Sequence, residues 1–206
     1  MSAVLTSAAV QPGVAFELDG QPVTAHPGET ILKAAQRHGV DIPHLCFKDG
    51  YWPDGNCRAC VVEVQGERTL APSCCRSVTP GMQVQASSPR ARKSQQMVVE
   101  MLLSDMPDQG YKWIDGDVTR PHGELSDWAA QLDVQVRPEL RALRRVQPVA
   151  DVSHPAMAVN LDACIQCNRC VRACREEQVN DVIGYALRGA DSKIVFDLDD
   201  PMAESS

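Results

Sequence analysis

The chain has 206 residues, of which 44% are hydrophobic and only 4% aromatic. That length allows one to three small domains with modest cores and excludes a large catalytic fold. The net charge is −7, from 27 acidic and 20 basic residues, and a surface of this sign repels phosphate backbones and anionic lipid headgroups. We therefore expect neither nucleic acid nor a membrane surface as a partner.

The stretch from Met1 to Leu32 contains no Lys or Arg. It therefore lacks the positive region of a secretory signal and a twin-arginine motif. No apolar run approaches the roughly 20 residues that a membrane helix needs. We expect a cytoplasmic protein without a membrane span, in which the nine cysteines act as metal ligands rather than as disulfides.

A small mixed sheet with one crossing helix is predicted for the N-terminal part, after a flexible tail at residues 1–13. Asp19 and Gly20 indicate the turn of a hairpin. Thr30 is in position to cap the helix, and Gly39 is in position to end it. The predicted elements are strands at Val14–Leu18 and Pro22–Ala25, a helix at Ile31–His38, and strands at Val61–Val64 and Met82–Val84.

The middle of the chain has no cysteine and is predicted to be a helical connector. An amphipathic helix is expected over Pro89–Leu103, followed by weaker helical signals at Ser126–Leu132 and Pro138–Arg145. The apolar stripe that we expect to pack consists of Met97, Val98, Met101 and Leu102. We interpret a run of three arginines as a solvated helix face and assign it no site: Arg141, Arg144 and Arg145.

Four of the first five cysteines have a spacing that favours an iron–sulfur centre. They are Cys46, Cys57, Cys60 and Cys74, spaced C-x10-C-x2-C-x13-C. Four thiolates fit a [2Fe–2S] cluster, and small residues around Gly55 allow backbone N–H groups to point at its sulfurs. The alternative is structural zinc in an interaction module with no redox role. Zinc favours a second close pair, and Cys74-Cys75 is adjacent instead of C-x2-C.

Four segments around these cysteines resemble the N-terminal [2Fe–2S] domain of the large iron–sulfur subunit of respiratory complex I. The same domain begins the α subunit of NAD-dependent molybdenum or tungsten formate dehydrogenases and the diaphorase part of NAD-reducing hydrogenases. The resemblance implies a ferredoxin β-grasp over residues 14–88. It also implies Cys74 as the fourth ligand and Cys75 as a spare thiol. The segments are Ile42–Cys46, Gly55–Val64, Ala71–Cys74 and Pro80–Met82.

The last four cysteines form the bacterial ferredoxin run that holds [4Fe–4S] clusters. They are Cys164, Cys167, Cys170 and Cys174, spaced C-x2-C-x2-C-x3-C. In two-cluster ferredoxins the fourth cysteine of such a run ligates the other cluster. We therefore expect Cys174 to be available to a second cluster, and the segment 151–206 to be incomplete. Two alternating runs after it, Val182–Ala186 and Lys193–Leu198, predict a small hairpin.

The stretch Asp162–Arg175 looks most like formate dehydrogenase α subunits. Many members of these families also carry an H-x3-C-x2-C-x5-C motif for a middle [4Fe–4S] cluster. Here no cysteine occurs between Arg76 and Ala163, so these residues cannot form that cluster.

The predicted architecture is α+β, with a β-grasp [2Fe–2S] domain at 14–88, a helical connector at 89–150 and a ferredoxin-like [4Fe–4S] segment at 151–206. The resemblance implies an electron relay in a formate dehydrogenase complex, with no catalytic site in these residues. Molybdopterin, FMN and NAD are expected only in its partners, the remaining catalytic part of the α subunit and a flavin- and NAD-binding diaphorase subunit. The alternative is the iron–sulfur subunit of an NAD-reducing hydrogenase or a complex I-like NADH dehydrogenase.

Overall fold

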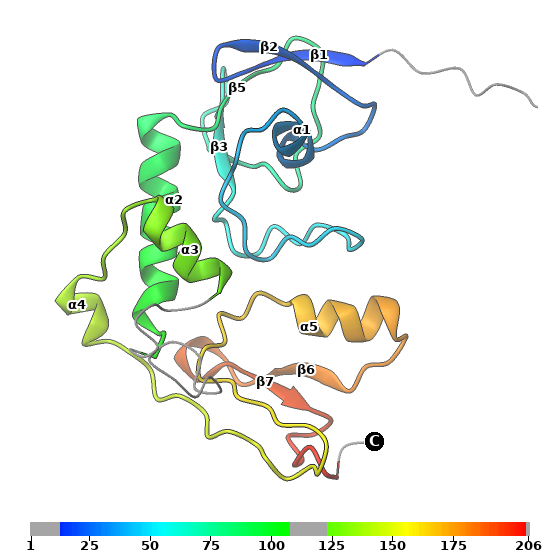
Figure 1. Ribbon diagram of the computed structural model, residues 1–206, viewed down its shortest axis with the longest axis vertical. Helices are drawn as coiled ribbons and strands as arrows, with labels where there is room; N and C mark the ends of the chain where they lie inside the picture. The colour runs from blue at the N-terminus through cyan, green and yellow to red at the C-terminus, as the bar shows by residue number, and fades with distance from the viewer. Residues whose placement is uncertain (1–12, 108–122, 205–206) are drawn as a thin grey trace, which may run out of the picture.

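The computed structural model describes residues 13–107 and 123–204 (Figure 1). The N-terminal sheet and the C-terminal hairpin lie at opposite ends of the molecule, and helices along one side connect them. Almost all of the tail predicted at residues 1–13 lies outside the described residues. Within the described part of the chain, no helix is long and apolar enough to cross a membrane.

The N-terminal sheet has five strands in the order β2-β1-β5-β3-β4. β1 and β5 run parallel, and the other neighbouring strands are antiparallel. This is the mixed sheet with one crossing helix that the sequence predicts, with β4 as an addition. The elements are β1 (Val14–Leu18), β2 (Gln21–Ala25), α1 (Ile31–Arg37), β3 (Val61–Val64), β4 (Ala71–Pro72) and β5 (Gln83–Gln85).

Local signals explain the hairpin and the helix ends. Asp19 and Gly20 have φ angles of 48° and 80°, as the tight turn between β1 and β2 requires. The Asp19 side chain also accepts a hydrogen bond from the backbone N–H of Ala86 at 2.8 Å, which fastens this turn to the end of β5. Thr30 caps α1, because its hydroxyl oxygen accepts from the N–H of Lys33 at 3.4 Å.

Leu18→Ala should destabilise the protein strongly, because Leu18 is only 1% exposed and lies in the cluster of buried side chains between the sheet and α1. Deleting a buried leucine side chain costs about 2–5 kcal/mol. Urea unfolding of the iron-loaded protein measures the loss. Gln85→Ala in the same sheet is the control, because Gln85 is exposed and its removal should change stability by less than about 0.5 kcal/mol.

Helix α2 (Pro89–Ser104) packs only partly through the predicted stripe, of which Val98 and Leu102 lie against buried side chains. Met97 and Met101 are 45% and 60% exposed, so the predicted apolar stripe is wrong at these two positions. The physical reason is Gln95, whose buried side-chain amide donates to the carbonyl of Val61 in β3 at 2.9 Å. This bond fixes the rotation of the helix. The buried positions of α2 are Ala91, Gln95, Val99, Glu100 and Ser104.

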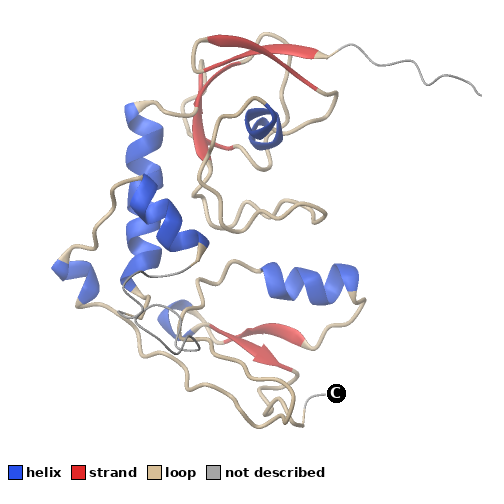
Figure 2. Cartoon of the chain, viewed as in Figure 1, coloured by secondary structure: helices blue, strands red, loops and turns tan. Residues whose placement is uncertain are grey.

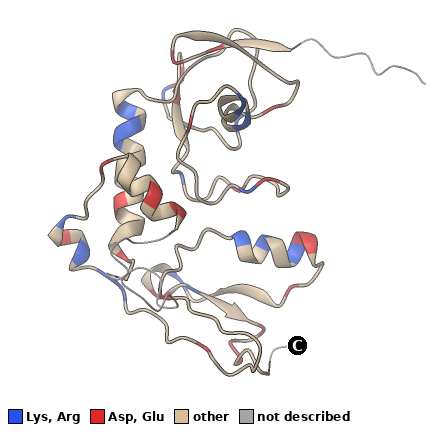
Figure 3. Ribbon diagram, in the orientation of Figure 1, with Lys and Arg blue, Asp and Glu red and all other residues tan. Residues whose placement is uncertain are grey.

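The connector contains α3 (Glu124–Gln131) and α4 (Pro138–Arg141), and α4 ends earlier than predicted. Figure 3 shows basic residues on α4. The interpretation of the run Arg141, Arg144 and Arg145 as a solvated helix face is wrong for Arg141, whose guanidinium donates to the carbonyls of Ser104 and Met106 at 2.9 and 2.7 Å. These bonds attach α4 to the end of α2.

The C-terminal part consists of short elements (Figure 2). Strands β6 and β7 pair antiparallel, as the sequence predicts. The elements are α5 (Arg169–Arg172), the π-helical turn η1 (Ala173–Glu177), β6 (Ile183–Ala186), the turn η2 (Gly189–Asp191) and β7 (Lys193–Phe196).

Candidate functional site

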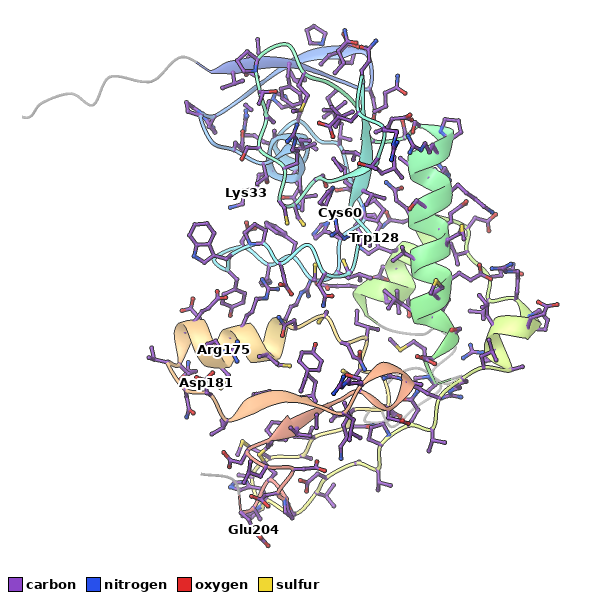
Figure 4. The ribbon with its side chains drawn as sticks, turned by 180° about the vertical axis from the view of Figure 1, so that it is seen from behind. Lys33, Cys60, Trp128, Arg175, Asp181 and Glu204 are labelled. Carbon is purple, nitrogen blue, oxygen red and sulfur yellow. The ribbon has the colours of Figure 1, made fainter. Side chains whose placement is uncertain are left out.

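The four cysteines predicted to hold the [2Fe–2S] cluster come together at one end of the sheet, and we call them the N-terminal group. Cys46 and Cys57 lie in the loop between α1 and β3, Cys60 lies directly before β3, and Cys74 follows β4. Cys57 is half-buried and the other three are buried. Figure 4 marks Cys60 beside β3 and the loop that precedes it.

The sulfur atoms of the N-terminal group are close enough to share protons. A hydrogen bond between the thiols of Cys46 and Cys57 lowers the pKa of Cys46 and raises the pKa of Cys57. The pKa of Cys60 is lowered by a hydrogen bond from Cys74, whose own pKa is raised by its bonds to Cys46 and Cys60. Four thiolates at this separation repel one another, so all four ionise together only around positive charge. Iron supplies that charge, and the donor set therefore fits a [2Fe–2S] cluster.

Backbone N–H groups in the loop point at these sulfurs. The N–H groups of Cys57 and Asn56 hydrogen-bond the sulfur of Cys46, and those of Cys46 and Ala59 hydrogen-bond the sulfur of Cys57. Arg58 has a φ angle of 58°, which closes the tight C-x2-C turn. Hydrogen bonds of this kind tune the potential of an iron–sulfur cluster.

Gly55 and Cys75 are in tight contact beside the group. A methyl group at Gly55 would lie 2.9 Å from the sulfur of Cys75, and the φ angle of Gly55 is 64°. Cys75 itself is exposed, and its thiol donates to the carbonyl of Pro53 at 3.7 Å. A side chain at position 55 would therefore displace the sulfur of Cys75 and would have to adopt a left-handed backbone conformation.

Gly55→Ala should reduce the iron content of the N-terminal group and lower the melting temperature. The added methyl displaces Cys75, and the left-handed backbone costs a further amount of about 1–2 kcal/mol. Iron analysis and thermal melting measure both effects. The double variant Gly55→Ala/Cys75→Ala lacks the close contact, so it should lose less iron and less thermal stability than Gly55→Ala. Cys75→Ala alone is the control for the removal of the thiol. If Gly55→Ala and the double variant lose equal amounts, the contact with Cys75 is not the cause.

Zinc binding is the alternative considered for these cysteines. A structural zinc site needs four ligands around one ion. Zinc and a [2Fe–2S] cluster can both use four thiolates, so the choice between them depends on the comparison with known proteins and not on the thiols alone.

We call the four cysteines of the ferredoxin run the C-terminal group. The surroundings of Cys174 differ from those of the other three. Burial raises the pKa of Cys164 and of Cys170, and the neighbouring charge of Cys167 raises both further. Cys174 has a different partner: its buried thiol donates to the carbonyl of Asn180 at 3.0 Å. The charges of Cys164, Cys167 and Cys170 therefore act on one another, whereas the thiol of Cys174 is bonded to a backbone carbonyl.

The two groups lie next to each other in space, which the sequence does not reveal. The loop that carries Cys46 and Cys57 faces α5 (Figure 1). The side chain of Asn56 donates to the carbonyl of Gln166, and that of Asn168 donates to the carboxylate of Asp54, both at 3.0 Å. Each contact joins residues of one cysteine loop to residues of the other.

Arginine side chains to which the sequence assigns no role also support these loops. Arg145 is half-buried, donates to the carbonyl of Cys164 at 2.7 Å and pairs with Asp105 at 3.1 Å. The interpretation of Arg145 as solvated is therefore wrong. Arg169 donates to the carbonyl of Phe47 at 2.8 Å. No local sequence signal identifies such contacts, because their partners are distant in the chain.

Comparison with known proteins supports the N-terminal assignment. Residues 11–89 match the family model described as "2Fe-2S iron-sulfur cluster binding domain". The NADP-reducing hydrogenase subunit HndD of Solidesulfovibrio fructosivorans is 34% identical over 84% of this chain. The mitochondrial NADH dehydrogenase iron-sulfur protein 1 of Solanum tuberosum is 32% identical over 86% of it. The chain spans only 29% and 23% of the length of these two relatives.

A solved structure matches most of the chain. It is a crystal structure of an NAD+-reducing [NiFe]-hydrogenase in the H2-reduced state, with a TM-score of 0.73 and 27% sequence identity. The match covers 92% of this chain and 79% of the hydrogenase chain. The similarity therefore extends well beyond the N-terminal domain.

Proposed function

Because residues 11–89 match the [2Fe–2S] cluster-binding domain family, we propose that this chain relays single electrons between two iron–sulfur clusters. The N-terminal group holds a [2Fe–2S] cluster, and the C-terminal group supplies ligands to a [4Fe–4S] cluster. The observation that carries the proposal is the direct contact of the two cysteine loops through Asn56 and Gln166. Two redox centres in adjoining loops can exchange an electron without a mobile carrier.

The residues of the chain bind and tune these clusters and perform no bond chemistry themselves. When bound, each cluster accepts and returns one electron at a time. The thiolates hold the iron, burial of Cys46, Cys60 and Cys74 keeps water away, and backbone N–H groups favour the charged sulfurs. The proposed division is a [2Fe–2S] domain at 14–88, a connector at 89–150 and a [4Fe–4S] segment at 151–206.

We place this relay in a formate dehydrogenase complex of the cytoplasm. Two sequence features support that choice: the stretch Asp162–Arg175 and the lack of cysteines between Arg76 and Ala163. The proposed partners are a molybdopterin-containing catalytic part, which oxidises formate, and a flavin subunit that reduces NAD. Both the molybdopterin and the flavin belong to those partners.

A subunit of an NAD-reducing hydrogenase or of an NADH dehydrogenase is the second candidate. The relatives and the solved structure reported above are proteins of these two kinds, so the comparisons fit this candidate about as well. In each candidate the chain relays electrons, and the candidates differ in the source of the electrons and, for an NADH dehydrogenase, also in their acceptor.

Iron and sulfide analysis with EPR of the reduced chain tests the relay itself. A brown protein with charge-transfer absorption is expected, with a [2Fe–2S] EPR signal in the reduced chain and a second iron–sulfur signal from the C-terminal group, which is a three-iron signal in the oxidised chain where that site has lost iron. A colourless protein that contains zinc and no sulfide would overturn the proposal.

Electron donors separate the two candidates. With a molybdopterin formate dehydrogenase catalytic subunit present, formate should reduce the [2Fe–2S] cluster of this chain. Dihydrogen with a [NiFe]-hydrogenase catalytic subunit should not reduce it. The reverse result would identify the hydrogenase candidate.

A further inference from the structure

Arg172 on α5 is a buried cation that contacts the loop of the other cysteine group. Its side chain is part of the interior, with 6% of the residue exposed. The guanidinium donates to the carbonyl of Cys46 and to the carbonyl of Trp52, the latter at 2.6 Å. It also lies over the ring of Tyr51, at 5.8 Å from the ring centre. All of these partners belong to the loop that carries the N-terminal group.

None of these partners carries a negative charge. The other two arginines of the same segment have carboxylate partners: Arg169 pairs with Glu124 at 2.5 Å and Arg175 with Asp181 at 2.7 Å (Figure 4). Within the described part of the chain, Arg172 has only carbonyl oxygens and an aromatic ring, and its Nε is buried without a hydrogen-bond partner. A charge buried in this way is costly unless an opposite charge lies nearby.

The cluster of the N-terminal group would supply that opposite charge. Two iron ions and two sulfides held by four thiolates carry a net negative charge, and one ligand is Cys46, whose own carbonyl Arg172 binds. The guanidinium group of an arginine carries a positive charge. The cation and the cluster then compensate each other.

We propose that Arg172 is the counter-ion of the [2Fe–2S] cluster and raises its reduction potential. This inference rests on the proposed function, since it needs the cluster to be bound. Reduction adds one electron to the cluster, converts one ferric ion to ferrous and leaves every bond in place. The electron comes from the C-terminal cluster in the protein, or from dithionite in the test. The added negative charge is stabilised by the nearby cation, which favours the reduced form.

Arg172→Gln in the full chain tests the proposal by EPR-monitored redox titration. The substitution removes the charge and leaves an amide that can donate to a carbonyl. We expect the equilibrium constant for reduction of the [2Fe–2S] cluster to fall at least tenfold, which is about 59 mV for a one-electron couple. Arg172→Lys retains the charge, so its potential should stay closer to that of the unmodified protein than the potential of Arg172→Gln.

Two control variants separate charge from structure. Arg175→Gln removes an exposed cation that is paired with Asp181, and its effect should be less than twofold. Arg169→Gln/Glu124→Gln breaks the bond to the carbonyl of Phe47 and removes both members of an ion pair, so it changes no net charge and reports the loss of an interloop anchor alone. A fall in this double variant as large as that in Arg172→Gln would overturn the proposal.

The remaining outcomes are also decisive. An unchanged potential in a fully loaded Arg172→Gln overturns the inference and leaves the proposed function intact. Absence of a [2Fe–2S] signal in the unmodified chain overturns the proposed function itself. If Arg172→Gln does not assemble the cluster, Arg172→Lys decides: a potential near that of the unmodified protein supports the charge role, and a tenfold fall in its reduction constant contradicts it.

Discussion

Cys74→Ser should abolish the EPR signal of the [2Fe–2S] cluster, whereas Cys75→Ser should leave it in place. Cys74 is fully buried, and its thiol bonds to those of Cys46 and Cys60 inside the N-terminal group. Cys75 is exposed and its thiol donates to the carbonyl of Pro53 at 3.7 Å. Serine is a poor substitute for a thiolate ligand, so the loss should be close to complete. Iron analysis and EPR of the reduced proteins measure it.

The adjacent position of the two sulfurs demands one further control. The Cys75 sulfur lies 3.5 Å from that of Cys74, so it is the nearest replacement ligand when Cys74 is missing. Any residual signal in Cys74→Ser should therefore vanish in Cys74→Ser/Cys75→Ser. A signal that persists in Cys74→Ser and disappears in Cys75→Ser would reverse the assignment.

Local sequence signals were sufficient for the N-terminal sheet. The Asp19-Gly20 turn, the Thr30 cap and the alternating strands each depend on neighbouring residues, and the structure contains all of them. β4 has only two residues, Ala71 and Pro72, and its pairing with β3 depends on a distant strand. Nothing in so short a stretch predicts it.

Apolar periodicity predicts the packed face of helix α2 only in part. The methionines suggest the packed face, but the rotation of the helix is set by the bond from Gln95 to Val61, which are far apart in the chain. A buried polar group must find its partner, and that requirement outweighs the burial of Met97 and Met101. Apolar periodicity carries no information about such a bond.

The candidate site also has features that the sequence predicts and features that it does not. Spacing predicts the pair Cys57 and Cys60 and the C-terminal run, whereas the choice of Cys74 over Cys75 depends on the family resemblance. The proximity of the two groups, and the support from Arg145 and Arg172, depend on contacts between residues more than a hundred positions apart or in separate elements. These contacts are visible only in the folded chain.

Cys174→Ser should leave the iron of the C-terminal group unchanged, whereas Cys164→Ser should remove it. The charges of Cys164, Cys167 and Cys170 all act on the nearby Tyr185, and burial together with these charges raises the pKa of that tyrosine to about 12. The buried thiol of Cys174 is instead bonded to the carbonyl of Asn180 at 3.0 Å. Three thiolates hold three corners of a [4Fe–4S] cluster, so in isolation the site should lose iron towards a three-iron form.

The competing possibility is that Cys174 completes a four-cysteine site. Its thiol would have to leave the carbonyl of Asn180, and the turn η1 that contains it would have to change shape, because Asn180 also donates its backbone N–H to the carbonyl of Cys174 at 3.0 Å. Mössbauer and EPR spectra of the chain and of Cys174→Ser decide between the two. A stable [4Fe–4S] signal that disappears on this substitution would establish Cys174 as the fourth ligand. A three-iron signal that survives it would show that Cys174 is not a ligand of this cluster and remains available to a different one.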